Sequence, residues 1–191
     1  MNTKSKRQQL RERQRNQKFR TYFIWGAIGV AVLSILGIIL RQGARPEAGE
    51  PIPVMTTTHI ATDSDPGTYN SNPPTSGPHY AEEAKVGFHD SDNYKFPAGY
   101  LVHNLEHGYV IFWYNCDLLD ETACAELKSQ IKSVMEELGG VKLIAYPWPS
   151  LDVPLAITSW GRLQIFESFD AGQAKAFYRA NLNSAPEPNA P

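Results

Sequence analysis

Cysteine is scarce in this sequence of 191 residues, which contains only Cys116 and Cys124. Seven residues separate them, so they do not form the C-x-x-C pair of a thioredoxin-type redox site. Outside the cytoplasm, oxidising conditions favour a disulfide, and the pair's position between an expected strand and an expected helix suits that closure. Free thiols and soft-metal ligands are the alternatives.

The short motifs of several large enzyme classes are also missing. The sequence contains no G-x-S-x-G, no Walker A loop and no Rossmann glycine pattern. A nucleophile made of cysteine and histidine can be imagined, but nothing in the spacing selects it. No motif therefore assigns a common enzyme class.

Charged residues are absent from Thr21 to Leu40, a run of twenty residues. At about 1.5 Å per residue, a helix of this length spans roughly the 30 Å hydrocarbon core of a bilayer. The run predicts one transmembrane helix; a cleaved signal peptide or a buried helix is the alternative. Residues 1–20 carry eight Lys or Arg against one acidic residue. The positive-inside rule therefore predicts a cytoplasmic basic arm, with the rest of the chain outside the plasma membrane.

Basic residues are few beyond this anchor. Residues 41–55 are rich in Pro, Gly and Glu and predict a linker, and residues 184–191 predict a disordered tail.

From residue 51 onward the chain holds eight basic and seventeen acidic residues. This balance argues against a nucleic-acid partner and is compatible with attraction of cations. We expect residues 56–183 to form one extracytoplasmic domain.

Hydrophobic periodicity in this domain predicts four strands and two helices. The apolar run from Gly108 to Asn115 is typical of a strand buried on both faces. Asp120 precedes one amphipathic segment, and Asp170 with Gln173 has capping-box spacing before a second. The other strands are expected at 141–147, 154–160 and 162–168. The order strand-helix-strand-hairpin-helix predicts an α+β fold with a small mixed sheet, and resembles the later part of a thioredoxin-like fold, including Pro154 just ahead of a strand.

Residues 56–100 show little periodicity and are rich in Pro, Gly, Asn and Asp. Such a long segment is either disordered or a shaped functional loop, and its six aromatic residues favour order. We therefore expect an ordered Pro/Gly/His-rich loop region. Three prolines between Tyr69 and Tyr80 stiffen the chain, which can aim His79 without a helix or strand.

All five histidines lie between Thr58 and Gly108. Imidazole binds zinc, copper, iron and nickel, and it also transfers protons near neutral pH. His89 is expected to be an ordinary loop histidine beside Asp90 and Asp92. The remaining four are the expected ligands of a copper or zinc ion: His59, His79, His103 and His107. The expected partners that orient these imidazoles are Tyr80, Asn104 and Glu106.

His103 and His107 are four residues apart, which places them about 5–6 Å apart on a helix but roughly 13 Å apart on a strand. A helical turn that ends at Gly108 therefore suits a shared metal. The metal hypothesis predicts that the imidazole nitrogens of His79, His103 and His107 lie within roughly 4 Å of one another, and a failure to converge would count heavily against a metal. The same letters fit the inverted zincin motif H-x-x-E-H with Glu106 as general base, although the strand after Gly108 ends any helix at once.

The segments "NPPTSGPHY", "YLVHNLEHGYVIFWY" and "PLAITSWGRLQIF" resemble the family known as domain of unknown function 3105, from about His59 to Pro188. The resemblance implies a shared fold and a protein that is secreted or anchored by one N-terminal span. His79, His103 and His107 lie in its specific motifs.

The sequence thus predicts a single-pass, outward-facing protein that binds copper or zinc, with catalysis less favoured. One alternative is a metal-dependent hydrolase. The other is an interaction domain in which histidine and asparagine form a structural network. The sequence identifies no protein partner.

Overall fold

The structure is a computed structural model that describes residues 23–26, 28–30, 48–91 and 93–189. The chain forms two compact units, Met1–Pro46 and Glu47–Pro191. In the first unit, residues 23–26 and 28–30 are helical. Within the described ranges no helix is long and apolar enough to cross a membrane, and most of the predicted span, residues 21–40, lies outside those ranges.

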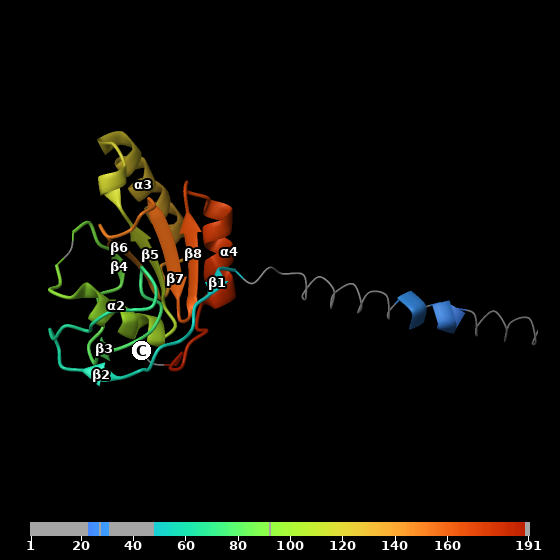
Figure 1. The fold of residues 1–191 in the computed structure, drawn as a ribbon. Coiled ribbons are helices and arrows are strands. Elements are labelled where there is room, and N and C mark those ends of the chain that lie inside the picture. Colours follow the sequence, from blue (N-terminus) through green and yellow to red (C-terminus); the bar gives the residue numbers. More distant parts are fainter. Residues whose placement is uncertain (1–22, 27, 31–47, 92, 190–191) are drawn as a thin grey trace, which may run out of the picture. The chain divides into compact units, whose positions relative to one another are not determined.

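A six-stranded mixed sheet forms the centre of the second unit, in the order β1-β8-β7-β5-β6-β4 (Figure 1). Its strands are β1 Glu50–Pro51, β4 Gly87–Phe88, β5 Val110–Tyr114, β6 Leu143–Pro147, β7 Leu155–Ser159 and β8 Arg162–Phe166. Strand β6 pairs parallel with β4 and β5, whereas the pairs β5/β7, β7/β8 and β1/β8 are antiparallel. The mixed sheet is confirmed. It is larger than predicted because the two-residue strands β1 and β4, which lack a readable period, extend its edges.

Strand β5 lies near the middle of the sheet and is fully buried, as its continuous apolar run predicts. Its alternate side chains enter two different cores. Val110, Phe112 and Tyr114 join the core under helices α3 (Glu121–Glu137) and α4 (Ala171–Asn181). Ile111 and Trp113 join a second core beneath helix α2 (Pro97–Glu106) and the loop region. The sheet is therefore covered on both faces.

The two predicted helices form where expected. Helix α3 spans Glu121–Glu137, and helix α4 spans Ala171–Asn181. The Asp120 side chain accepts a hydrogen bond from the Ala123 N–H, and Asp170 accepts one from the Gln173 N–H. Each aspartate thus satisfies one of the free N–H groups of a first helical turn.

Helix α2, Pro97–Glu106, is longer than the single turn argued from the sequence. Pro97 fits the start of a helix, where no N–H partner is needed. Gly108 follows the helix with a φ of +83°, which allows the chain to turn directly into β5. The sequence prediction underestimated α2 because its first residues lie in a segment with few periodic signals.

The loop region lies against α2 and forms a two-stranded parallel sheet of β2 His59–Ile60 and β3 His79–Tyr80 (Figure 1). Its described part is well packed, since Thr75, Ser76 and His79 are fully buried. Gly99 of α2 permits close approach of this sheet, because an added Cβ would collide with the Tyr80 ring. The loop region therefore holds its histidines over one face of α2.

The predicted disulfide between Cys116 and Cys124 is present, with the Cα atoms 5.3 Å apart. It links the short 3₁₀ helix η1, Cys116–Leu118, to the first turn of α3. Thioredoxin-type chemistry is not offered by this pair, which has no C-x-x-C spacing.

The C-terminal segment, residues 184–191, is the one predicted from the sequence as a disordered tail. The structure describes it as far as residue 189. The Glu187 N–H donates to the Glu106 carbonyl at 3.0 Å, and the Lys142 ammonium donates to the Pro188 carbonyl at 2.8 Å. These contacts depend on residues far away in the chain, so the local composition could not indicate them.

Candidate metal centre

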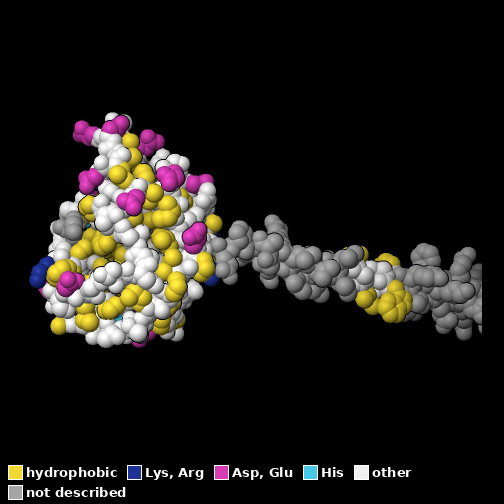
Figure 2. All heavy atoms as spheres, in the orientation of Figure 1, with side chains coloured by type: hydrophobic (Ala, Val, Ile, Leu, Met, Phe, Trp, Pro, Cys, Tyr) yellow, Lys and Arg dark blue, Asp and Glu magenta, His cyan; other side chains and the backbone are white. Residues whose placement is uncertain are grey.

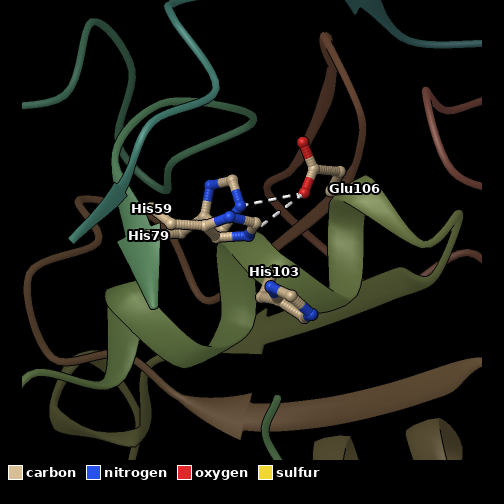
Figure 3. Close-up of side chains that lie close together, drawn as sticks. All are labelled: His59, His79, His103 and Glu106. Carbon is tan, nitrogen blue, oxygen red and sulfur yellow. Dashed lines mark hydrogen bonds and ion pairs between the residues drawn. The ribbon is translucent and has the colours of Figure 1, made fainter. Parts of the chain in front are cut away.

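Three imidazoles and one carboxylate converge between the small sheet and α2 (Figure 3). One ligand atom from each residue lies within 4.8 Å of the other three; the residues are His59, His79, His103 and Glu106. We refer to these four residues as the His/Glu cluster. Figure 3 shows His59 and His79 facing α2, which supplies His103 and Glu106.

Secondary structure explains this convergence. His59 and His79 are directly paired in the parallel ladder of β2 and β3, so their side chains project from the same side of that sheet. Their rings lie 4.7 Å apart between centroids. His103 and Glu106 are three residues apart on α2 and therefore share one helix face.

His79 is positioned by hydrogen-bond acceptors on both sides of its ring. Its Nδ1 lies 2.7 Å from the Gly77 carbonyl oxygen, and its Nε2 lies 2.9 Å from Oε2 of Glu106. A carbonyl oxygen only accepts, so Nδ1 carries the hydrogen and donates to Gly77. In the neutral ring, Nε2 then presents a lone pair to the carboxylate, and a cation between these two atoms removes the repulsion. A proton or a metal ion meets this requirement.

Glu106 is the acidic member of the cluster and its side chain is only 5% exposed. Besides His79, its Oε2 lies 3.9 Å from Nε2 of His59. A buried carboxylate requires a compensating positive partner, because loss of hydration is costly for a charge. The sequence prediction placed Glu106 beside the metal as an orienting partner; the structure places it among the candidate ligands.

His103 is buried and its Nδ1 has no hydrogen-bond partner within the described part of the chain. Burial lowers the pKa of His103 to about 4, and the neighbouring imidazoles add to this shift. The ring is therefore neutral at physiological pH, which is the form that binds a metal. A buried nitrogen without a hydrogen-bond partner destabilises the folded state, and a bound metal ion would remove this penalty.

His59 is the accessible member of the cluster, with a side chain that is 52% exposed. Tetrahedral zinc with bonds of about 2.0–2.1 Å sets neighbouring ligand atoms roughly 3.3 Å apart, closer than the 4.8 Å limit of this cluster. A metal-bound form therefore requires small shifts of the ligand atoms. His59 has room to move because solvent rather than protein surrounds half of its side chain.

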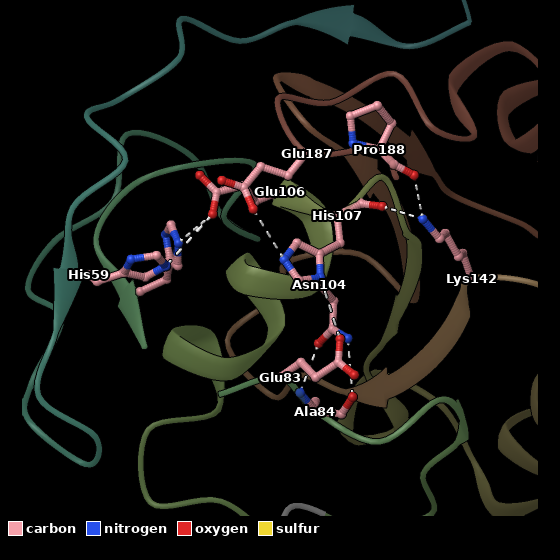
Figure 4. Close-up of polar contacts among 10 residues, drawn as sticks. His59, Glu83, Ala84, Asn104, Glu106, His107, Lys142, Glu187 and Pro188 are labelled. Carbon is pink, nitrogen blue, oxygen red and sulfur yellow. Dashed lines mark hydrogen bonds and ion pairs between the residues drawn. The ribbon is translucent and has the colours of Figure 1, made fainter. Parts of the chain in front are cut away.

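His107, the fourth predicted ligand, is not part of the His/Glu cluster. Its ring lies 4.3 Å from the ring of His103, but its nitrogens face Glu83 and Glu187 (Figure 4). The predicted convergence of His79, His103 and His107 within roughly 4 Å is therefore not found: His79 and His103 share a cluster with a wider limit of 4.8 Å, and His107 is not in it. The four-residue spacing on the helix does bring the rings of His103 and His107 together. The three-residue spacing of His103 and Glu106, which also places two side chains on one helix face, was the sequence feature that could have identified Glu106 as a ligand in place of His107.

The side chains of two predicted orienting partners hold the scaffold. The Asn104 side chain accepts from the Ala84 N–H and donates to the Ala84 carbonyl, which fixes this loop segment against α2. The Tyr80 hydroxyl donates to the Ser64 carbonyl and joins two loop segments, while the Tyr80 backbone hydrogen-bonds His103. His89 lies outside the cluster, where its Nε2 is 2.8 Å from the Lys85 carbonyl.

Comparison with known proteins identifies one family. The family described as Protein of unknown function (DUF3105) matches residues 59–191, a range that includes all four residues of the cluster. No curated protein and no solved structure matches the chain significantly. Because the match covers more than half of the sequence, the chain belongs to the DUF3105 family of proteins of unknown function.

Proposed function

We propose that this protein binds a transition-metal ion, zinc or copper, through His59, His79, His103 and Glu106. The observation that carries the proposal is the contact between Nε2 of His79 and Oε2 of Glu106, at 2.9 Å. Gly77 fixes the hydrogen of His79 on the other nitrogen, so this buried contact is satisfied either by a proton or by a metal ion that binds both atoms. Two further imidazoles each place a nitrogen within 4.8 Å of a ligand atom of His79 and of Glu106.

The donor set supports Zn²⁺ or Cu²⁺ over a softer ion. Imidazole nitrogen suits zinc and copper, and a carboxylate oxygen is a common additional zinc ligand. Soft Cu⁺ sites use thiolates or thioethers. Both cysteines are joined in the disulfide, and the four residues of the cluster offer only nitrogen and oxygen ligands.

Metal binding is favoured over hydrolysis by the position of Glu106. A general base must reach a water molecule that attacks the substrate. The carboxylate of Glu106 is buried and already contacts His79. It is thus better placed to bind the ion than to act on a water molecule beside it.

We also propose that residues 21–40 anchor the protein as a single-pass span, with the N-terminus in the cytoplasm and the domain outside the plasma membrane. The charge-free run and the eight basic residues before it support this orientation. The disulfide is compatible with an oxidising compartment. Acidic side chains outnumber basic ones on the face in Figure 2, which suits attraction of cations.

The four strands β6-β5-β7-β8 with α3 and α4 support a thioredoxin-like arrangement as the finer description of the fold. The first pair is parallel and joined through α3, and the hairpin adds two antiparallel strands before α4. We propose this likeness for the topology alone, because function is decided by the site.

The test of metal binding uses the full chain, purified in detergent without chelator. We expect about one equivalent of zinc or copper by elemental analysis. Zinc at 100 times its Kd stabilises a protein by about 2.7 kcal/mol, which raises the Tm of a domain of this size by roughly 5–10 °C. Absence of both bound metal and a Tm change would falsify the proposal.

Two variants locate the site. Glu106→Gln keeps the side-chain size but removes the anionic ligand, so we expect the Tm response to zinc at concentrations near the wild-type Kd to be largely lost. His89→Ala removes an imidazole outside the cluster and serves as the control, with a preserved response. Equal responses in both variants would place the metal elsewhere, and no response in wild type would favour a structural histidine network.

A further inference from the structure

His107 is the candidate ligand that the His/Glu cluster does not use. The residue is only 8% exposed, and its Nδ1 is buried without a hydrogen-bond partner in the described structure. This nitrogen faces Oε2 of Glu83 at 3.7 Å. That separation is too long for a hydrogen bond, so the pair leaves the Nδ1 lone pair and the carboxylate oxygen uncommitted.

The opposite side of the ring has a different role. Nε2 of His107 lies 3.7 Å from Oε2 of Glu187, a residue of the C-terminal segment (Figure 4). Metal-binding histidines commonly direct the second ring N–H toward a carboxylate, which fixes the tautomer and strengthens the ligand nitrogen. If Nδ1 of His107 binds the ion, the Glu187 carboxylate is positioned to orient the Nε2–H side of the ring.

The surroundings of His107 connect solvent with the His/Glu cluster. The Glu83 side chain is 42% exposed and that of Glu187 is 58% exposed. On the inner side, the His107 ring lies 4.3 Å from the ring of His103, a member of the cluster. Nδ1 of His103 is also buried without a hydrogen-bond partner among the described residues.

We propose that His107 Nδ1 and the Glu83 carboxylate form a second, weaker site for the same divalent cation, with Glu187 orienting the imidazole. The site lies between exposed carboxylates and His103. Two protein ligands bind more weakly than four. This inference rests on the proposed metal function and adds a second site beside it.

The experiment is a calorimetric titration of the metal-free full chain in detergent with Zn²⁺. We expect two steps in wild type, one tight and one weaker. Glu83→Gln keeps the tight step and loses the weaker one, while Glu187→Gln weakens the second step about 10–100-fold. Glu82→Gln removes the same charge from the neighbouring exposed residue and should retain both steps.

A fourth variant separates the two sites. Glu106→Gln should lose the tight step and keep the weaker one, because its substitution leaves His107 and Glu83 intact. A single tight step in wild type, or a weaker step that survives Glu83→Gln, would overturn the second site while leaving the proposed function standing; His107 would then be an ion-paired imidazole only. Absence of the tight step in wild type would instead refute the proposed function.

Discussion

At the residue scale, the position of His79 depends on Gly77. Gly77 has a φ of +132°, and its carbonyl accepts the Nδ1 hydrogen of His79. An added Cβ would lie 2.9 Å from the Tyr69 ring. We expect Gly77→Ala to lower the free energy of unfolding by about 1 kcal/mol or more and to weaken zinc binding by roughly 10–100-fold. Urea unfolding and calorimetry measure the two effects.

Gly67 provides a matched control for this substitution. It also has a positive φ, of +81°, but nothing lies within 4 Å of an added Cβ. Gly67→Ala should therefore share the backbone strain and leave zinc affinity unchanged. Equal zinc affinities in the two alanine variants would show that Gly77 does not position His79.

His103 should make the metal-free protein sensitive to acid. Burial lowers its pKa to about 4 from the usual 6.5, so the unfolded chain binds more protons between these pH values. The free energy of unfolding therefore decreases as the pH falls from 6.5 to 4, by on the order of 1–3 kcal/mol, and this group has little effect above pH 7. Urea unfolding with EDTA across this range measures the loss. His103→Gln should flatten the profile, and an unchanged profile would contradict the assignment.

At the element scale, the end of α2 is held by residues from two distant parts of the chain. The Lys142 ammonium donates to the His107 carbonyl and to the Pro188 carbonyl, each at 2.8 Å. A cation at a helix C-terminus compensates the unpaired carbonyls of the last turn. Lys142 adopts a φ of +47°, which is uncommon for a residue other than glycine. This strain is tolerated where other contacts fix the backbone.

We expect Lys142→Met to destabilise the protein by about 1–3 kcal/mol, because two charge-assisted hydrogen bonds are lost while the apolar stem remains. Zinc affinity should fall as well, since the last turn of α2 carries Glu106. Lys95→Met is the control, because the Lys95 ammonium lies over the exposed side of the Phe96 ring. Chemical unfolding and calorimetry of both variants make the comparison; equal stability of the two would refute this role of Lys142.

Helices and strands whose apolar residues recur at a regular spacing could be predicted from the sequence, and elements without such a spacing could not. The buried run of β5 and the capping aspartates of α3 and α4 follow from local sequence alone. The pairing of His59 with His79 does not, because strands of two residues have no period and their partner is twenty positions away. The sequence therefore predicted all three histidines of the His/Glu cluster as ligands. The fourth member is Glu106, whereas the sequence predicted His107.

At the scale of the whole molecule, the domain that follows the proposed membrane anchor is acidic and contains a buried candidate cation site. The sheet separates this domain into two cores, and the cluster lies on the side of α2, away from the core of α3 and α4. The disulfide belongs to that other side, since Cys116 packs against the core of α3 and α4. Reduction of the disulfide should therefore lower the Tm and leave the zinc stoichiometry at the tight site unchanged.

The central claim is tested most directly by X-ray absorption spectroscopy at the zinc edge, on the full chain loaded with one equivalent of Zn²⁺. We expect nitrogen and oxygen ligands at about 2.0–2.1 Å, with the outer scattering of about three imidazoles, and loss of this pattern in Glu106→Gln. A spectrum of hydrated zinc without imidazole scattering, or one unchanged in Glu106→Gln, would contradict the account.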